Sequence, residues 1–472
     1  MDAQAGDAFD ETARLSRRSF SRQAALAAGA GVAALTGVGV VTAQEGTPAA
    51  APDGTPAAGG LAMDAVKTSL PHVFDYEDFQ FQFLISLGQV YERTADAGEL
   101  FATAALIPDY DYDAWFDAFY ALGERINDEA EASDEAGQIE SAREAFLRAS
   151  TYYAQASFFA DGTKDPSRLI PTWEQHRAAW DAFAARIDPP AEAVEIPYEG
   201  TTLPGYAFTV DNSGEPRPWL IMNNGSDGTT TDMWAQGAAE ALRRGYNTLI
   251  FDGPGEGAAL YRQNLPFRYD WEKVITPVVD YLLTRSDVDA ERIAIIGISQ
   301  GGYWVPRAVA FEHRIAAAIA DPGVMDVGTI YKGFVPPDVV PMLATATGDE
   351  LTQLEAEIQK GVDEAAANNP QMSFMLTYRL RPYGTTSFPE VLKLVLDYNL
   401  TDVVGQIQCP MLIADPEGEQ FWPGQSQQLY DALTSPKTLV KFTAAEGADL
   451  HCEPKALGLR AQRFFDWLDA TM

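Results

Sequence analysis

The sequence predicts an α/β fold in which helices cover both faces of a mostly parallel central sheet. From residue 191 onward, short apolar runs alternate with segments of helical periodicity, an alternation typical of parallel sheets. Residues 75–186 show helical spacing without strand patterns, and residues 322–400 interrupt the alternation with helical sequence. We therefore expect a helical segment ahead of the sheet and a helical insertion within the sheet region.

The composition narrows the classes of function. The chain has 472 residues, of which 46% are hydrophobic, so it can bury a full core, and its formal net charge is −35. Because so strong a negative charge repels phosphate backbones, we expect no nucleic-acid partner. Two cysteines exclude a disulfide scaffold and a cysteine-rich metal site, and no pattern indicates a metal or a cofactor.

The first 43 residues have the pattern of an export signal. Arg17 and Arg18 precede an uncharged stretch rich in Ala and Gly, and small residues lead up to Ala43. This pattern predicts a twin-arginine-type signal peptide over residues 1–43, recognition by the Tat export machinery, cleavage near Ala43 and a periplasmic or extracellular mature protein. An uncleaved membrane anchor is the alternative. Residues 44–72, rich in Pro, Ala and Gly, predict a flexible linker.

Residues 73–190 predict a helical cap domain. Aromatic residues recur there at helical spacing, for example at Trp115, Phe116 and Phe119. Such a stripe indicates helix packing in the first place, and contact of a few rings with substrate in the second.

Residues 191–472 predict the domain that holds the sheet. Apolar runs predict strands at 194–196, 206–210, 219–222, 247–251, 292–296, 315–320, 410–414 and 438–442. Helical periodicity predicts helices at 271–284, 301–312 and 456–468. The insertion at 322–400 is too long for a bare loop, so we expect it to fold as a helical lid.

The most specific motif contains a serine. Residues 297–301 read Gly-Ile-Ser-Gln-Gly and lie between a predicted buried strand and a predicted helix. In that context the G-x-S-x-G pattern forms a nucleophile elbow, since glycine two residues before and after the serine avoids a clash in the tight turn. The motif predicts Ser299 as a catalytic nucleophile, with a structural glycine-rich turn as the alternative.

A serine hydroxyl needs a neighbouring base, and the chain has only four histidines. His72 abuts the linker and His176 lies in the helical segment. His313 ends the helix that begins at the elbow, which places it far from the serine. His451 follows the last predicted strand, at the carboxyl edge of the sheet where the elbow also lies. By elimination we predict His451 as the general base.

The loop after the predicted strand at 410–414 offers the acid that would orient the histidine. Three acidic residues crowd together there, and we favour Glu419, with Glu417 and then Asp415 as alternatives. Asp321, at the end of the preceding predicted strand, is a separate alternative. Each could also be a solvated loop acid in so acidic a protein.

Two backbone N–H groups are expected to form an oxyanion hole. One belongs to Gln300, directly after the nucleophile, and the other to Ser226, in the loop after the strand at 219–222, with Asp227 as the alternative to Ser226. Residues 252–257 read Asp-Gly-Pro-Gly-Glu-Gly and lack the spacing of a dinucleotide-binding loop, so we interpret them as a tight turn beside the active site.

Together these motifs resemble the α/β-hydrolases. The elbow, the turn at 252–257 and the loop Ala-Asp-Leu-His-Cys-Glu-Pro at 448–454 carry the likeness. The segment 194–206 resembles one branch, that of FrsA-like esterases, 2,6-dihydroxypseudooxynicotine hydrolase and fungal enzymes that shorten pigment polyketides. The resemblance implies a helical domain ahead of the hydrolase domain. Similar sequences are often assigned as dipeptidyl aminopeptidases, but residues 75–186 show no strand repeats of a β-propeller. A Glu at the acid position departs from the family's usual Asp.

We therefore expect an exported serine hydrolase that cleaves a carboxylic ester of a small apolar or aromatic acyl substrate through an acyl-enzyme. The resemblance also implies a first alternative, hydrolysis of a carbon–carbon bond in β-diketone-like substrates, followed by dipeptidyl or aminoacyl peptidase activity. A non-catalytic binding protein that keeps the fold is the alternative from a different class. The sequence leaves the oligomeric state open, a homodimer included.

Overall fold

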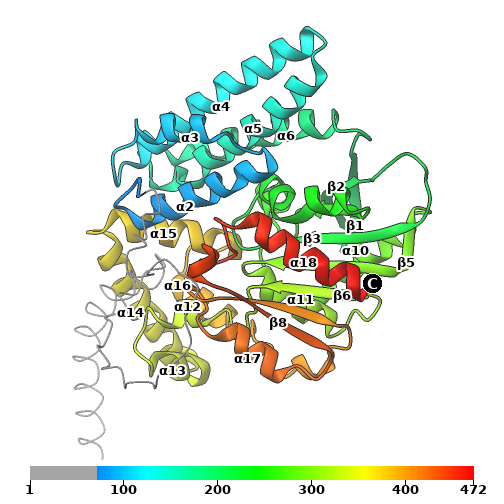
Figure 1. Cartoon of the computed structure of the whole chain (residues 1–472). Coiled ribbons are helices and arrows are strands. Elements are labelled where there is room, and N and C mark those ends of the chain that lie inside the picture. The colour runs from blue at the N-terminus through cyan, green and yellow to red at the C-terminus, as the bar shows by residue number, and fades with distance from the viewer. Residues whose placement is uncertain (1–71) are drawn as a thin grey trace, which may run out of the picture.

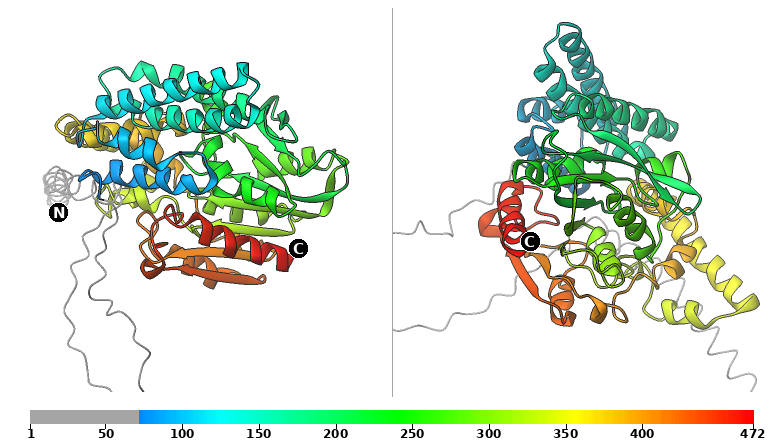
Figure 2. Two further views of the ribbon diagram at one scale, coloured as in Figure 1. Left: turned by 45° about the horizontal axis from the view of Figure 1, so that its top comes forward. Right: turned by 90° about the vertical axis from the view of Figure 1, so that its right-hand side faces the viewer.

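The computed structural model describes residues 72–472, so the predicted signal peptide and nearly all of the predicted linker lie outside the described residues. A layer of helices leads into a central sheet, and a second group of helices is inserted between two strands of that sheet (Figure 1). The helical layer and the last strand lie on opposite sides of the molecule (Figure 2). Within residues 72–472, no helix combines the length and apolarity that a membrane span requires.

The first layer consists of α2 (Glu77–Gly88), α3 (Ala97–Ala104), α4 (Tyr112–Glu135), α5 (Ile139–Phe158) and α6 (Leu169–Ala184). The start of α4 is set by Asp111, whose carboxylate accepts the N–H of Ala114 at 2.9 Å. Trp115 and Phe119 recur at helical spacing and are fully buried, and the Trp115 indole N–H donates to the Gln155 carbonyl of α5 at 2.9 Å. The aromatic stripe thus packs helix on helix, as its spacing predicted.

The sheet has eight strands in the order β1-β2-β4-β3-β5-β6-β7-β8. Their bounds are β1 (Glu192–Tyr198), β2 (Thr201–Phe208), β3 (Arg217–Asn223), β4 (Asn247–Phe251), β5 (Val288–Ile298), β6 (Ala317–Asp321), β7 (Met411–Pro416) and β8 (Lys437–Phe442). The pairs β1–β2 and β2–β4 are antiparallel and the other five are parallel. The mostly parallel α/β fold is therefore confirmed, and β3 to β8 all end at one edge, where open α/β sheets bind their ligands.

Helices cover both faces of this sheet, because each parallel crossover needs one. They are α7 (Thr230–Met233), α8 (Ala239–Arg243), α9 (Gly257–Tyr261), α10 (Glu272–Leu282), α11 (Gly301–Val309), α17 (Gln425–Ala432) and α18 (Leu457–Thr471). The strands β3 to β7 are mostly or wholly buried along their length, as strands covered on both faces must be.

The predicted strand at 206–210 is placed differently in the structure. It begins at Thr201, where β1 and β2 form a hairpin, and ends at Phe208. The Val210 N–H donates to the Asn247 side chain at 2.9 Å and leaves the ladder. The strand therefore ends where a side-chain acceptor on β4 replaces a backbone partner. The apolar pattern of the segment does not predict that acceptor.

The insertion after β6 is helical, with α12 (Thr329–Lys332), α13 (Val339–Thr345), α14 (Gly348–Ala366), α15 (Pro370–Leu380) and α16 (Phe388–Leu394). Its helix α15 lies against the first layer, beside α2 (Figure 1). Ring contacts join the two groups, with centroids 5.2 Å apart for Tyr112 and Phe374 and 4.9 Å apart for Phe158 and Tyr378. Two helical groups far apart in the sequence therefore meet above the carboxyl edge of the sheet.

Candidate active site

The turn from β5 into α11 presents Ser299. The serine has φ 57°, a left-handed conformation that costs a non-glycine residue free energy and is typical of a nucleophile elbow. A Cβ on Gly297 would lie 2.1 Å from the Gly301 carbonyl oxygen, so the turn requires glycine there. The Ser299 N–H donates to the Asp321 carbonyl of β6 at 2.6 Å, which ties the elbow to the neighbouring strand.

His451 lies in the loop between β8 and α18 and contacts the serine. The distance from His451 Nε2 to Ser299 Oγ is 2.9 Å, and that from His451 Nδ1 to Glu419 Oε2 is 2.8 Å. The aromatic rings of Phe421 and Trp422 pack on the imidazole, with centroids 4.7 and 5.7 Å away. A serine, a histidine and a carboxylate thus form one hydrogen-bonded chain, in which Nδ1–H donates to the carboxylate and Nε2 accepts the serine proton.

Glu419 is held in place by backbone groups as well as by the histidine. Its Oε1 accepts the N–H groups of Phe421 at 2.9 Å and Trp422 at 3.0 Å. Burial by itself would raise the pKa of Glu419, but the charge that His451 can carry and these hydrogen bonds outweigh it and hold the pKa below its ordinary value. The carboxylate is therefore ionised at neutral pH and faces the imidazole as an anion.

The other acids considered for this position are engaged elsewhere. Glu417 accepts the N–H of Ala444 at 2.9 Å, and Asp415 faces Lys441 at 3.7 Å. The Asp321 carboxylate is buried and accepts a hydrogen bond from Arg460 at 2.6 Å. Of the four acids, all in the described part of the chain, only Glu419 is hydrogen-bonded to His451. Because several acids lie close together in the loop, the sequence does not show which carboxylate faces the histidine.

The loop after β3 presses against the elbow. A Cβ built on Gly225 would lie 2.6 Å from both the Ile298 carbonyl oxygen and the Ser299 Cβ. The backbone N–H groups of Ser226 and Gln300 have no acceptor within residues 72–472. They are therefore free to bind an oxygen beside the serine, while the Asp227 carboxylate forms an ion pair with Arg379 at 3.1 Å.

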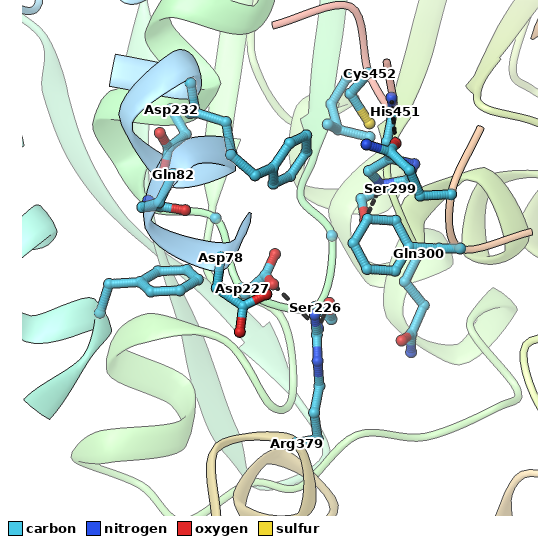
Figure 3. A pocket seen from close by; sticks show the side chains of 18 of the residues that line it. Asp78, Gln82, Ser226, Asp227, Asp232, Ser299, Gln300, Arg379, His451 and Cys452 are labelled. Atoms are coloured by element: carbon cyan, nitrogen blue, oxygen red, sulfur yellow. Dashed lines mark hydrogen bonds and ion pairs between the residues drawn. The ribbon is translucent and has the colours of Figure 1, made fainter. Parts of the chain in front are cut away.

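A cavity of about 160 Å³ opens onto Ser299 and His451 (Figure 3). Its walls come from α2, the end of α5, the loop after β3, α12, α15 and the loops after β7 and β8. Eight aromatic side chains line it, namely Phe81, Phe158, Phe159, Tyr331, Phe374, Tyr378, Phe421 and Trp422. The described residues contain no group of three or more side chains that could hold a metal ion.

Comparison with known proteins decides the family. Residues 239–339 match the model of the prolyl oligopeptidase family. The chain is 30% identical to a hydrolase of Fusarium sp over 84% of this chain and 97% of that protein. It is also 30% identical to the 20-hydroxy-prefusarin hydrolase of Gibberella moniliformis, over 84% of this chain and 97% of that protein. The chain belongs to the α/β-hydrolase superfamily.

Solved structures with the same fold resemble this hydrolase. It superimposes on the crystal structure of the 2,6-dihydroxy-pseudo-oxynicotine hydrolase with a TM-score of 0.63 and 21% identity, over 82% of this chain and 95% of that one. The superposition on wild-type AbyA5 has a TM-score of 0.56 and 17% identity, over 84% of this chain and 95% of that one. The match extends over most of this chain, so the helices ahead of the sheet belong to the shared architecture.

The other three histidines of the hydrolase lie away from the serine. His176 is buried in α6, where its ring bonds to Ser150 at 2.9 Å and burial lowers its pKa to about 4. The His313 ring contacts the Ala310 carbonyl at 3.0 Å, and His72 is exposed.

Neither Arg379 nor Asp78, which both line the cavity, was singled out from the sequence. Only the meeting of distant helices brings them to the site.

Proposed function

We propose that this protein is a serine hydrolase whose nucleophile is Ser299. The observation that carries the proposal is the chain of hydrogen bonds from Ser299 Oγ through His451 to Glu419, at 2.9 and 2.8 Å, at the wall of a cavity lined by eight aromatic side chains. A hydroxyl becomes a nucleophile only when a base accepts its proton, and this chain provides the base together with the anion that orients it.

In the proposed reaction, Ser299 Oγ attacks the acyl carbon as His451 Nε2 accepts its proton. The resulting oxyanion accepts the N–H groups of Ser226 and Gln300. The protonated histidine then gives its proton to the leaving alcohol, and the acyl-enzyme forms. A water molecule, deprotonated by the same imidazole, then attacks the acyl carbon, and the imidazolium returns that proton to Ser299 Oγ as the acyl–oxygen bond breaks and the acid leaves.

The proposed substrate is a carboxylic ester with an apolar or aromatic acyl group. Aromatic rings on the walls favour such a group, since they offer large apolar surface at low cost in conformational entropy. In this proposal the helices of the first layer act as a cap and the insertion at 322–400 acts as a lid, because α2 and α15 both line the cavity.

Reaction with a fluorophosphonate probe tests the nucleophile. We expect the purified protein to be labelled at one site and the Ser299→Ala variant to remain unlabelled. Equal labelling of the two proteins, or no labelling of the wild type, would rule out a serine enzyme of this kind.

A panel of carbonyl compounds tests the bond that is cleaved. We expect turnover of aryl esters at rates above those for aminoacyl amides and for acyl-phenol diketones. Turnover of the diketones with none of the esters would replace the esterase by a carbon–carbon hydrolase, which needs the same nucleophile and base. Turnover of the amides alone would indicate a peptidase.

We also propose that the protein is exported through the Tat pathway, on the evidence of Arg17, Arg18 and the segment up to Ala43. Expression of the full chain in a bacterial host with and without the Tat translocase tests this. We expect an exported protein that begins near residue 44, and retention of the longer form when the translocase is absent or both arginines are replaced by lysine. Export that is independent of the translocase would contradict the proposal.

A further inference from the structure

The active-site cavity has a polar end whose side chains take no part in the proposed reaction. Three elements meet there: α2 contributes Asp78, α15 contributes Arg379, and the loop after β3 contributes Ser226 and Asp227 (Figure 3). Arg379 Nη1 donates to Ser226 Oγ and to the Asp227 carboxylate, both at 3.1 Å. All four residues line the same cavity as Ser299, so one bound molecule can contact both ends.

Arg379 and Asp78 both have unused hydrogen-bonding capacity. No residue in the range 72–472 accepts a hydrogen bond from Nε or Nη2 of Arg379. Asp78 Oδ2 accepts the Tyr76 hydroxyl at 2.7 Å, whereas Oδ1 has no donor in the same part of the chain. Donors and an acceptor are thus available at one end of a cavity that aromatic side chains also line.

The two side chains do not neutralise each other. Arg379 forms its ion pair with Asp227, and no ion pair joins it to Asp78. Their charges nevertheless interact: burial raises the pKa of Asp78 to about 6, while the Tyr76 hydrogen bond and the charge of Arg379 act in the opposite direction. A guanidinium and a carboxylate therefore line one cavity without forming an ion pair with each other.

We propose that Arg379 and Asp78 together bind a hydroxyl group of the substrate. A hydroxyl both accepts and donates, so it can accept from Arg379 and donate to Asp78 at the same time. An anionic group would be repelled by Asp78 and would meet a guanidinium already paired with Asp227. An ammonium group could pair with Asp78, but it accepts no hydrogen bond from Arg379 and would lie beside its positive charge. Glu77 and Asp232 also line the cavity, so ammonium esters are included in the test. The inference rests on the proposed function, because it assigns the substrate class of the same cavity.

The consequence is selection for a hydroxylated substrate. A site built to hydrogen-bond a hydroxyl discriminates strongly against an analogue that lacks it, because its polar groups are then left unpaired in the closed site. We expect at least a tenfold difference in kcat/KM at the chain length that places the hydroxyl between Asp78 and Arg379.

Matched ester series provide the test. One series carries a terminal hydroxyl on acyl chains of increasing length and the other carries a methyl group in its place, and a second pair of series varies the alcohol part in the same way. Esters with a terminal carboxylate or ammonium group complete the panel. For the wild type we expect the hydroxylated ester to exceed the methyl, carboxylate and ammonium analogues at one chain length.

Two variants locate the effect. Asp78→Ala is expected to lower kcat/KM for the preferred hydroxylated ester at least tenfold and to leave the methyl analogue nearly unchanged. Arg379→Met also removes the contact with Ser226 beside the oxyanion hole, so we expect it to lower both esters, the hydroxylated one at least tenfold more than the methyl analogue. Asp75→Ala is the matched control, since it removes a carboxylate three residues away whose side chain is 81% exposed. The rate of fluorophosphonate labelling at Ser299 is measured in every protein, so a damaged reaction centre is recognised separately.

The outcomes separate this inference from the proposed function. If the wild type is not labelled, the serine mechanism fails. If it is labelled and turns over esters but the ratio of hydroxylated to methyl ester stays near one at every length, the hydroxyl site is wrong, whatever the variants do. A preference for the carboxylate or the ammonium ester would also overturn it, as would equal loss of both esters in Asp78→Ala.

Discussion

At the scale of single residues, the glutamate at position 419 reaches the histidine because its two oxygens have different partners. Oε1 is held by the backbone N–H groups of Phe421 and Trp422, and Oε2 is left for the Nδ1 of His451 at 2.8 Å. The bonds to the backbone fix the longer side chain of glutamate in place. This arrangement explains how the chain departs from the usual aspartate while keeping a chain of hydrogen bonds to the serine.

We expect Glu419→Gln to lower kcat by about 10³- to 10⁴-fold, since the amide would favour the wrong histidine tautomer and could not stabilise the imidazolium. The matched control is Glu417→Gln, two residues away, whose side chain bonds to the Ala444 N–H. Ester hydrolysis under saturating substrate measures the effect. Similar losses in the two variants would show that Glu419 has no special role.

A second buried cluster, formed by Asp321, Glu453 and Arg460, adjoins the active site. Asp321 and Glu453 share one guanidinium, with Arg460 Nε 2.6 Å from the first carboxylate and 3.5 Å from the second, and all three side chains are buried. Burial, and then the charge of Asp321, raise the pKa of Glu453 well above its ordinary value. Burial and the neighbouring carboxylate thus favour the protonated form of Glu453 in the folded state.

This assignment predicts how stability depends on pH. The unfolded chain loses the Glu453 proton near the ordinary pKa, whereas the folded state keeps it. The stability that the group contributes is therefore complete below the unfolded pKa and is lost as pH rises toward the folded value, by up to about 1.4 kcal/mol per pH unit. Glu453→Gln lacks this dependence, so its free energy of unfolding relative to the wild type should rise from pH 5 to pH 8.

Urea denaturation of both proteins at the two pH values measures this difference. The control Glu350→Gln, on the exposed side of α14, should keep a constant difference from the wild type. A Glu453→Gln variant whose relative stability did not change with pH would contradict a protonated Glu453.

Some of the residues of the candidate site could be predicted from the sequence, and others could not. Ser299 was singled out because the elbow imposes a local pattern, and His451 because only four histidines had to be weighed. Glu419 was favoured over its neighbours without a physical distinction, since the inward turn of one carboxylate depends on the backbone geometry of the loop. Asp78 and Arg379 lie about 300 positions apart in the sequence and meet only in the folded chain.

At the scale of elements, the loop after β3 depends on a glycine that touches the elbow. We expect Gly225→Ala to lower kcat by about 10²-fold or more, because its methyl group would lie 2.6 Å from the Ser299 Cβ and displace the N–H of Ser226 from the oxyanion position. Gly405→Ala is the control, since a Cβ there meets nothing within 4 Å. Kinetics with an aryl ester, together with a melting curve for each variant, measure the effect. Unchanged kcat in Gly225→Ala would show that this loop does not form the oxyanion hole.

The elements themselves were largely predictable. All eight strands were found. The parallel strands β3 to β7 are largely buried apolar runs, and glycines or prolines separate them from the helices. The ends were less accurate. For example, β5 begins at Val288, four residues before the predicted start at 292. Val288 pairs with Arg217 of β3, and the regular register resumes at Ile293 after an irregularity. Strand ends depend on the neighbouring strand, and a pattern in one segment does not contain that information.

At the scale of the whole molecule, the helical layer is joined to the sheet by a buried ion pair. Arg177 of α6 contacts the Asp252 carboxylate at the end of β4, and its Nη1 donates to the Tyr206 hydroxyl of β2 at 3.2 Å. The side chains of Arg177 and Asp252 are only 4% and 6% exposed. The turn at 252–257 thus holds the helical layer against the sheet through its first residue, and we expect both parts to unfold in one transition.

Removal of the cation tests this junction. Arg177→Met would leave the Asp252 carboxylate buried without its partner, and breaking a buried ion pair in this way costs about 3–5 kcal/mol. In the double variant Arg177→Met/Asp252→Asn no uncompensated charge remains, so we expect much of the loss to be recovered. Urea denaturation followed by far-UV and near-UV circular dichroism measures the free energy of unfolding and shows whether the two signals change together. A single variant within about 1 kcal/mol of the wild type, or a helical signal lost well before the tertiary one, would show that the pair does not join the two parts.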